Sequence, residues 1–402
     1  MTKSRRLIAS MCVAEVATMA GVFGFPALLP IFLNEWALSN TEAGWIAGIY
    51  FGAYAIFVPV LVALTDRVDA RWIYLFGASL AVVSSAGFAL LAEGFWSGML
   101  FRAMAGVALA ATYMPGLKVL VDRYDGPKQS RAVAFYTSCF SLGTAVSFLL
   151  AGEIQVAFGW RWAFGASAVV ALVAVAVALS LGGVAPKPAE RKTHVLDFRP
   201  VLANRPAMAY VLGYGVHCWE LFTLRSWLVA LLAFNFISRP GGGDWPSPTS
   251  VAMFSGLVAM AASVAGNEAC VRYGRPRVIQ LIMLASAIMA CFIGFSTSLH
   301  YGILVALALL YSALVQFDSA ALTAGAIAAA DPSRQGATMA VHSLFGFGCA
   351  CIGPLVVGVV LDVSGGAATS LSWGLAFLSV GLVGLLGPFA VRMAATGDTK
   401  FH

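Results

Sequence analysis

Long apolar stretches alternate with short polar segments along the whole chain. An α-helix needs about 20 predominantly apolar residues to cross the hydrocarbon core of a bilayer, and twelve stretches reach that length. They are residues 7–33, 43–64, 72–93, 97–121, 131–156, 162–183, 207–237, 250–271, 277–299, 301–328, 335–361 and 370–394. The pattern therefore predicts an all-α polytopic membrane protein with 12 transmembrane helices.

The longest polar interval, residues 182–206, separates the spans into two sets of six. It contains prolines and five basic residues, which is typical of a linker. The chain contains an internal repeat with an offset of 205 residues. The segment after the second span matches the segment after the eighth, and Gly143 matches Gly348. We predict two pseudo-symmetric six-helix bundles, residues 1–183 and 207–402, joined by a cytoplasmic linker at 184–206.

Basic residues recur after every pair of spans. Of the 24 Lys and Arg residues, 19 lie in the segments 3–6, 67–71, 123–131, 187–205, 272–277, 334 and 392–400. The loops on the opposite side carry only Arg161 and Arg239. Because basic loops stay in the cytoplasm, we expect both termini there and the chain in a plasma membrane, the inner membrane in a bacterium.

The composition excludes several classes of function. With 60% hydrophobic and 10% charged residues, the chain is not a soluble globular protein, and its loops leave no room for a soluble catalytic domain. Anionic lipid at the cytoplasmic face accounts for the net charge of +6, so no nucleic-acid partner is expected. We predict no enzymatic activity and no catalytic residues, because no nucleophile with a positioned base and no phosphate-binding loop is present. We also expect no metal, no cofactor and a monomeric state.

The loop after the second span resembles a cytoplasmic motif of the major facilitator superfamily, Gly-x-x-x-Asp-Arg-x-Gly-Arg-Arg/Lys. The matching residues are Asp66, Arg67 and Arg71, and the departing ones are Val62, Asp69 and Ala70. Arg102 and Gly106 resemble the Arg-x-x-x-Gly element of the fourth span in the same family, and residues 159–164 resemble another recurrent sequence. The resemblance implies a secondary transporter in which helices 1, 4, 7 and 10 line a central cavity. It identifies a superfamily and no substrate.

By the same resemblance, the cytoplasmic motif implies gating. Asp66, Arg67 and Arg71 would join charge networks that latch the two halves, and Arg272 with Arg275 forms a second copy that lacks the acid. A role in topology alone is the alternative for both copies.

Charged side chains deep in the apolar stretches are candidate functional residues, because charge at membrane depth is costly and seldom kept without a partner or a task. They lie in spans 1, 4, 7 and 10 and are Glu15, Arg102, Lys118, His217, Glu220, Arg225 and Asp318. Glu153, Glu268 and His342 lie nearer to predicted helix ends and rank lower.

In span 4, Arg102 and Tyr113 fall on one line of the helix. A guanidinium group binds a carboxylate through two parallel hydrogen bonds, so Arg102 is a candidate anion ligand; a role in proton coupling or helix packing is equally open. Lys118 points the other way, one turn before Asp122. We interpret it as a lysine that reaches toward the cytoplasm and pairs with Asp122.

In span 7, Tyr210, Tyr214, His217, Glu220 and Arg225 share one broad helix face. A wet cavity would let these groups bind substrate and titrate, and a buried ion pair that joins the halves is the alternative. Glu220 and Arg225 are 140° apart around the helix and are not expected to pair with each other.

Two further acids are candidates for proton coupling. Asp318 shares a face of span 10 with Tyr311, and Glu15 lies in span 1. A carboxyl group in a medium of low dielectric constant favours its protonated form and can take up and release a proton as its surroundings change. Permanent neutralisation of Arg102 or Arg225 is the alternative for either acid.

These residues suggest proton-coupled transport of a small organic anion by alternating access. The predicted substrate ligands are Arg102, Tyr113, Tyr214, His217, Arg225 and Tyr311. The predicted proton-coupling residues are Glu15, Glu220 and Asp318. Efflux of hydrophobic or cationic compounds is one alternative, and a non-transporting receptor or sensor is another. The partners expected are the substrate, protons and membrane lipid.

Overall fold

A computed structural model describes residues 3–124, 129–185, 198–237 and 245–395, and the regular structure in these ranges is helical. Eleven of the described segments form helices long and apolar enough to cross a membrane. They correspond to the second to twelfth predicted spans. The first predicted span is broken into three helices, each too short to cross by itself.

The chain divides into two compact units. Unit 1 comprises residues 1–28 and 49–193, and unit 2 comprises residues 29–48 and 194–402. The predicted division into residues 1–183 and 207–402 differs from these units at residues 29–48 and stays a prediction. Most of the predicted linker, residues 186–197, lies outside the described residues, as do Lys128, Arg239 and Lys400.

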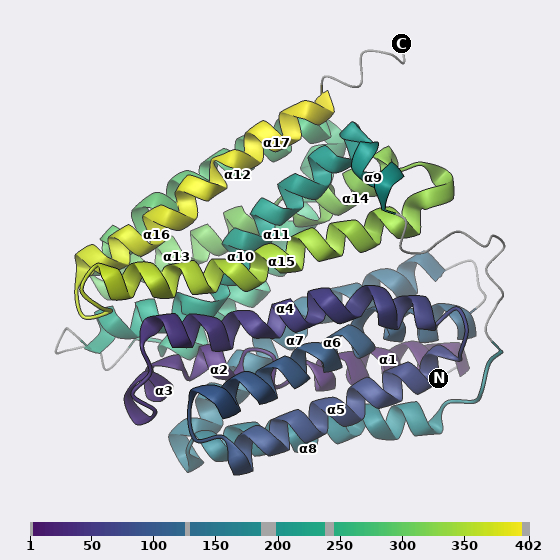
Figure 1. Cartoon of the computed structure of the whole chain (residues 1–402), viewed down its shortest axis with the longest axis horizontal. Helices are drawn as coiled ribbons and strands as arrows, with labels where there is room; N and C mark the ends of the chain where they lie inside the picture. The colour runs from purple at the N-terminus through teal and green to yellow at the C-terminus, as the bar shows by residue number, and fades with distance from the viewer. Residues whose placement is uncertain (1–2, 125–128, 186–197, 238–244, 396–402) are drawn as a thin grey trace. The chain divides into compact units, whose positions relative to one another are not determined.

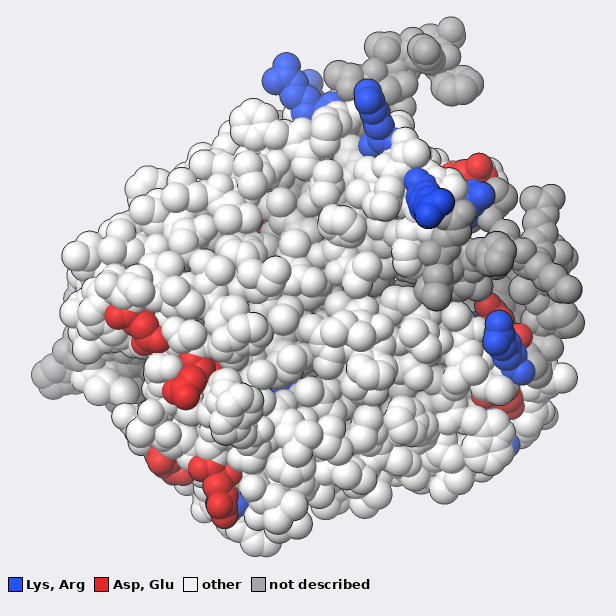
Figure 2. All heavy atoms as spheres, in the orientation of Figure 1, with Lys and Arg blue, Asp and Glu red and all other residues white. Residues whose placement is uncertain are grey.

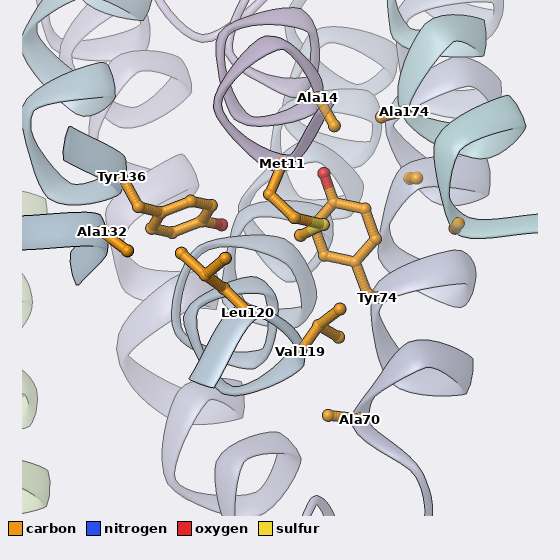
Figure 3. Packing of buried hydrophobic residues seen from close by; sticks show 11 residues of the cluster. Met11, Ala14, Ala70, Tyr74, Val119, Leu120, Ala132, Tyr136 and Ala174 are labelled. Carbon is orange, nitrogen blue, oxygen red and sulfur yellow. The ribbon is translucent and has the colours of Figure 1, made fainter. Parts of the chain in front are cut away.

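Unit 1 is built from helices of both short and full membrane length (Figure 1). They are α1 (Lys3–Thr18), α2 (Gly24–Ala27), the second part of α4 (Asn40–Leu64), α5 (Ala70–Leu91), α6 (Phe95–Arg123), α7 (Gln129–Phe158) and α8 (Trp160–Ser180). Helix α5 packs against both α6 and α8. In the core, Met11 of α1 lies among Tyr74, Leu120 and Tyr136, whose rings and side chains converge on α1 (Figure 3).

Unit 2 contains the remaining helices. They are α3 (Leu29–Glu35), the first part of α4, α9 (Arg199–Ala203), α10 (Arg205–Ile237), α11 (Pro248–Tyr273), α12 (Arg275–Ile293), η1 (Gly294–Ser298), α13 (Tyr301–Gln316), α14 (Ser319–Ala329), η2 (Pro332–Arg334), α15 (Gln335–Val363), α16 (Ser370–Gly384) and α17 (Leu386–Ala395). Helix α10 packs against α14, α15 and α17 and is buried over most of its length. A helix surrounded in this way can hold polar groups on several faces only if each finds a partner.

Two of the predicted spans are interrupted where the site residues gather. In the first span the α-helix gives way to turns between Thr18 and Gly24, next to Pro26, which lacks a backbone N–H. The tenth span ends as α13 at Gln316 and resumes as α14 at Ser319. Gly266 lets the backbone of this break pack closely against α11, because a Cβ atom at position 266 would collide with the carbonyl oxygen of Phe317.

The distribution of charge agrees with membrane insertion. On the visible face, Lys, Arg, Asp and Glu side chains lie near helix ends and leave the sides of the helices uncharged (Figure 2). Large apolar side chains cover those sides, and Ile56, Val169 and Phe389 are among the exposed ones. A surface of this kind is stable against lipid and not against water.

Candidate functional site

Arg102 of α6 is held at the break in the first span. Its Nη1 atom donates a hydrogen bond to the carbonyl oxygen of Val22, at 2.8 Å, and its guanidinium carbon lies 4.3 Å from the centre of the Tyr50 ring. The side chain is buried, yet Nε and Nη2 have no hydrogen-bond partner among the described residues. Nε and Nη2 form one edge of the guanidinium group, the edge that binds a carboxylate through two parallel bonds. Arg102 therefore has both a structural contact and an unoccupied donor pair.

Glu15 of α1 lies apart from that donor pair and binds a tyrosine. Its Oε2 atom accepts a hydrogen bond from the Tyr136 hydroxyl of α7 at 2.7 Å. Its Oε1 atom has no hydrogen-bond partner, and no ion pair to Glu15 is found among the described residues. Tyr113 stacks on the Tyr136 ring, with the ring centres 6.3 Å apart. The structure thus places Glu15 and Tyr113 around one tyrosine in the interior of unit 1.

In unit 2, the break in the tenth span brings Asp318 to His217. The Oδ1 atom of Asp318 lies 2.7 Å from Nδ1 of His217 on α10, and both side chains are almost fully buried. Two lone pairs would repel each other at that separation, so we expect one of the two groups to carry a proton. Asp318 and His217, assigned separate roles from the sequence, are direct partners.

A second histidine extends this pair. Tyr214 stacks on His217, with the ring centres 5.6 Å apart, and on His342 of α15, with the ring centres 3.8 Å apart. The Nε2 atom of His342 lies 3.3 Å from the Thr323 hydroxyl. His342 stood near a predicted helix end in the sequence, but its side chain is buried in the same cluster as Asp318.

Glu220 and Arg225 of α10 have different neighbours. The Ser286 hydroxyl of α12 donates a hydrogen bond to Oε2 of Glu220 at 3.0 Å. Arg225 donates to the side-chain oxygen of Gln316 at 3.2 Å. Glu220 therefore faces α12 while His217 faces Asp318, and the helix has no single polar face. Tyr311 of α13 is buried as well.

In the loop after the second span, the residue with the most hydrogen bonds is one that departs from the family motif. Asp66 and Arg67 are exposed in the turn before α5. Asp69, which departs from the family motif, accepts hydrogen bonds from the backbone N–H of Arg71 at 2.9 Å and from Nη2 of Arg123 at 2.8 Å. It also accepts from the backbone N–H of Val184 at 2.8 Å. Burial alone would raise the pKa of Asp69, but these donors outweigh it and lower the pKa below its usual value.

The remaining predicted gating residues form mostly local contacts. Arg71 lies over the Trp72 ring and donates to the carbonyl oxygen of Leu181. Arg272 is exposed and lies over the neighbouring Tyr273 ring, and Arg275 begins α12. Their predicted part in gating stays a prediction.

The structure tests two further expectations about ion pairs. Lys118 donates to both carboxylate oxygens of Asp122, at 2.8 and 2.9 Å, so the predicted pair is confirmed. Glu220 and Arg225 were not expected to pair, and no ion pair between them is found in the described part of the chain. The described residues also contain no group of three His, Cys, Asp or Glu side chains that could hold a metal ion.

Asp362 is a further residue that sequence reasoning missed. It lies in the last turn of α15 and accepts hydrogen bonds from the backbone N–H groups of Asn40 and Thr41, at 3.0 and 2.8 Å. Their side chains donate to it as well, at 2.8 and 2.6 Å. A single Asp near a helix end carries no local signal of this kind, because its partners are more than 320 residues away.

Comparison with known proteins places the chain in a family. A model of the Major Facilitator Superfamily matches residues 11–266. Protein spinster homolog 3 of Danio rerio is 20% identical over 236 residues, 56% of this chain and 47% of that protein. The multidrug efflux pump LfrA of Mycolicibacterium smegmatis is 32% identical over 158 residues, 38% of this chain and 30% of that protein. The chain thus spans less than half the length of these relatives.

Solved structures share the fold. A bacterial homolog of the human lysosomal transporter Spinster, in an inward-facing and unoccupied conformation, has a TM-score of 0.79 at 14% identity, covering 100% of both chains. The nucleoside transporter NupG has a TM-score of 0.76 at 15% identity, also over 100% of both chains. The predicted all-α fold is confirmed, with eleven of the twelve predicted spans forming helices of membrane length among the described residues, and the orientation of the termini stays a prediction. Because the family model matches more than half of its residues, this multi-pass membrane protein belongs to the Major Facilitator Superfamily.

Proposed function

We propose that the chain is a proton-coupled secondary transporter of a small organic anion that works by alternating access. Membership of the superfamily supports transport rather than an enzymatic activity. Most of the described residues lie in helices, which supports the same conclusion, because the side chains of these helices must carry the function.

The observation that carries the choice of an anion is the unoccupied donor pair of Arg102. A buried guanidinium group with Nε and Nη2 unsatisfied is costly by itself, and a carboxylate would satisfy both atoms at once. Tyr50 and the Val22 carbonyl hold the group in place, so little side-chain entropy is lost on binding.

The buried acids support proton coupling. Glu15, Glu220 and Asp318 are all buried, and they contact a tyrosine, a serine and a histidine, respectively. A carboxylate without a cation is unstable in such surroundings, and uptake of a proton removes its charge. Each acid can therefore exchange a proton when its surroundings change.

The test begins with ligand screening. Purified protein is heated with a panel of mono- and dicarboxylates, amines and inorganic anions at two pH values, and carboxylates should raise the melting temperature most. Uptake of the carboxylate that raises it most is then measured in liposomes. We expect an imposed pH gradient to drive accumulation, and uptake indifferent to both pH and voltage would contradict proton coupling.

Efflux of hydrophobic or cationic compounds is the second candidate. The relatives named as multidrug transporters, LfrA and the Aspergillus fumigatus transporter mfsC, favour it. Glu220 and Asp318 would then be ligands for the cation. Stabilisation by amines rather than carboxylates in the same screen, with loss of drug resistance on deletion, would support efflux over anion transport.

A further inference from the structure

We propose that His342 belongs to the proton-holding group of this chain, as a second imidazole acting together with His217 and Asp318. The inference rests on the proposed proton coupling and adds a residue to it. His342 comes from α15, His217 from α10 and Asp318 from the break between α13 and α14. Three elements of unit 2 thus bring three titratable groups into one buried cluster.

The hydrogen bonds of Thr323 indicate which nitrogen of His342 carries a proton. The Thr323 hydroxyl donates to the carbonyl oxygen of Ser319 at 3.2 Å. With its one hydrogen on Ser319, we infer that the hydroxyl accepts from Nε2–H of His342, which lies 3.3 Å away. This assignment leaves a lone pair on Nδ1 of His342, which has no hydrogen-bond partner among the described residues. Nδ1 is therefore the nitrogen of His342 at which the proposed site would hold a further proton.

Tyr214 connects the two imidazoles. Its ring is nearly parallel to both, at 20° to His217 and 16° to His342. The face of an aromatic ring attracts a nearby cation, so Tyr214 lies where it can contact the charged form of either imidazole. Two imidazolium groups this close would repel each other, so the cluster takes up one proton more readily than two.

The other titratable and charged groups around the cluster are few. Cys218 and Glu220 come from α10, Cys349 from α15 itself and Cys270 from α11. Arg225 donates to Gln316, two residues before Asp318. The carboxylate of Asp318 is the acid in contact with a histidine among the described residues. Its negative charge compensates one imidazolium, and the proton balance is simple: the anionic cluster binds one proton from one side of the membrane, becomes neutral, and releases that proton to the other side.

A purely structural histidine is the competing explanation, because His342 also ties α15 to α14 through Thr323. The two explanations differ in how the histidines titrate. A structural His342 keeps one protonation state and does not affect His217, whereas two members of one proton site titrate as a coupled pair.

The experiment uses the full-length chain labelled with ¹⁵N-histidine, in detergent micelles, and follows the imidazole nitrogen signals from pH 4 to pH 9. Variants H217N and H342N assign the two signals. Variant H300N is the matched control, because His300 caps the exposed start of α13 and Asn can also act as a cap. We expect H342N to move the titration midpoint of His217 by about one pH unit and H300N to leave it unchanged. An unchanged midpoint in H342N would overturn the inference.

Folding and function are controlled separately. If H342N does not fold, the wild-type titration decides: coupled two-step curves for the two histidines support the inference, and independent single-step curves overturn it. Coupled titration in a protein that moves no protons in liposomes would contradict the proposed function and leave the proton site standing. Proton-driven uptake with independent histidines would support the function and overturn the role of His342.

Discussion

The carboxylate of Asp362 caps helix α4 by accepting hydrogen bonds from both the backbone N–H and the side-chain hydroxyl of Thr41, at 2.8 and 2.6 Å. The first backbone N–H groups of a helix have no partner within the helix, and a negative charge there also interacts favourably with the helix dipole. Glycines let the two helices approach closely: a Cβ atom at Gly44 would meet the carbonyl oxygen of Pro354 at 2.6 Å, and one at Gly358 would meet that of Asn40 at 2.2 Å. Asp362 thus ties the start of α4 to the end of α15.

Replacing Asp362 should destabilise the protein. D362A removes the acceptor of four hydrogen bonds, and we expect the free energy of unfolding to fall by about 2–3 kcal/mol, since bonds to a charged group are stronger than neutral ones. Thermal unfolding in detergent, followed by circular dichroism, measures the loss. E93Q serves as the control because Glu93 is exposed at a loop, and an equal loss in E93Q would contradict the assignment.

Replacing Arg102 should separate anion binding from stability. R102K keeps a positive charge but loses the planar donor pair, so we expect stabilisation by carboxylates to disappear in the thermal screen. R102Q should also lower the free energy of unfolding by about 1–3 kcal/mol, because the Val22 carbonyl loses its donor.

Arg161 is the matched control for Arg102. It also donates to a backbone carbonyl, that of Ala89 at 2.9 Å, and lies 4.5 Å over the Trp160 ring. R161K should leave the response to carboxylates intact. If R102K and R161K respond alike to carboxylates, Arg102 is not the anion ligand.

Glu15 and Glu220 should behave alike. They lie 205 residues apart, the offset of the sequence repeat, and each accepts one hydroxyl hydrogen bond inside its own unit. We expect E15Q and E220Q to fold, because an amide preserves the size and an acceptor oxygen, and to lose uptake driven by a pH gradient. Exchange of substrate across a membrane without a gradient should persist in both. Normal gradient-driven uptake in either variant removes that glutamate from proton coupling.

Acid should release the contacts of Asp69. Its pKa is lowered in the folded protein, so the stabilisation is present at neutral pH, above the usual carboxyl pKa near 3.9, and is lost as the pH falls through the lower folded pKa. We expect the melting temperature of the wild type to fall more steeply below about pH 4 than that of D69N. D66N is the control, because Asp66 is exposed, and it should follow the wild type. Parallel curves for wild type and D69N would contradict this assignment.

The sequence predicted most element boundaries because they depend on local composition. The second span was predicted at 43–64 and forms α4, Asn40–Leu64; the eleventh was predicted at 335–361 and forms α15, Gln335–Val363. The Lys118 and Asp122 pair was predictable for the same reason, since residues four apart are neighbours on a helix. The break near Pro26 had a local cause as well, whereas residues 316–319 contain neither glycine nor proline.

The sequence by itself determined that this is a helical membrane protein, which segments are long and apolar enough to cross a membrane and which of them contain charged residues, because apolar length and helical spacing are properties of neighbouring residues. Only the tertiary structure decided that Asp318 meets His217, that Glu15 meets Tyr136 and that Asp362 caps α4. A buried polar group must find a partner wherever the packing of helices brings one, and that partner can lie hundreds of residues away. His342 shows this most clearly: its position near a predicted helix end gave no indication that its ring stacks on Tyr214.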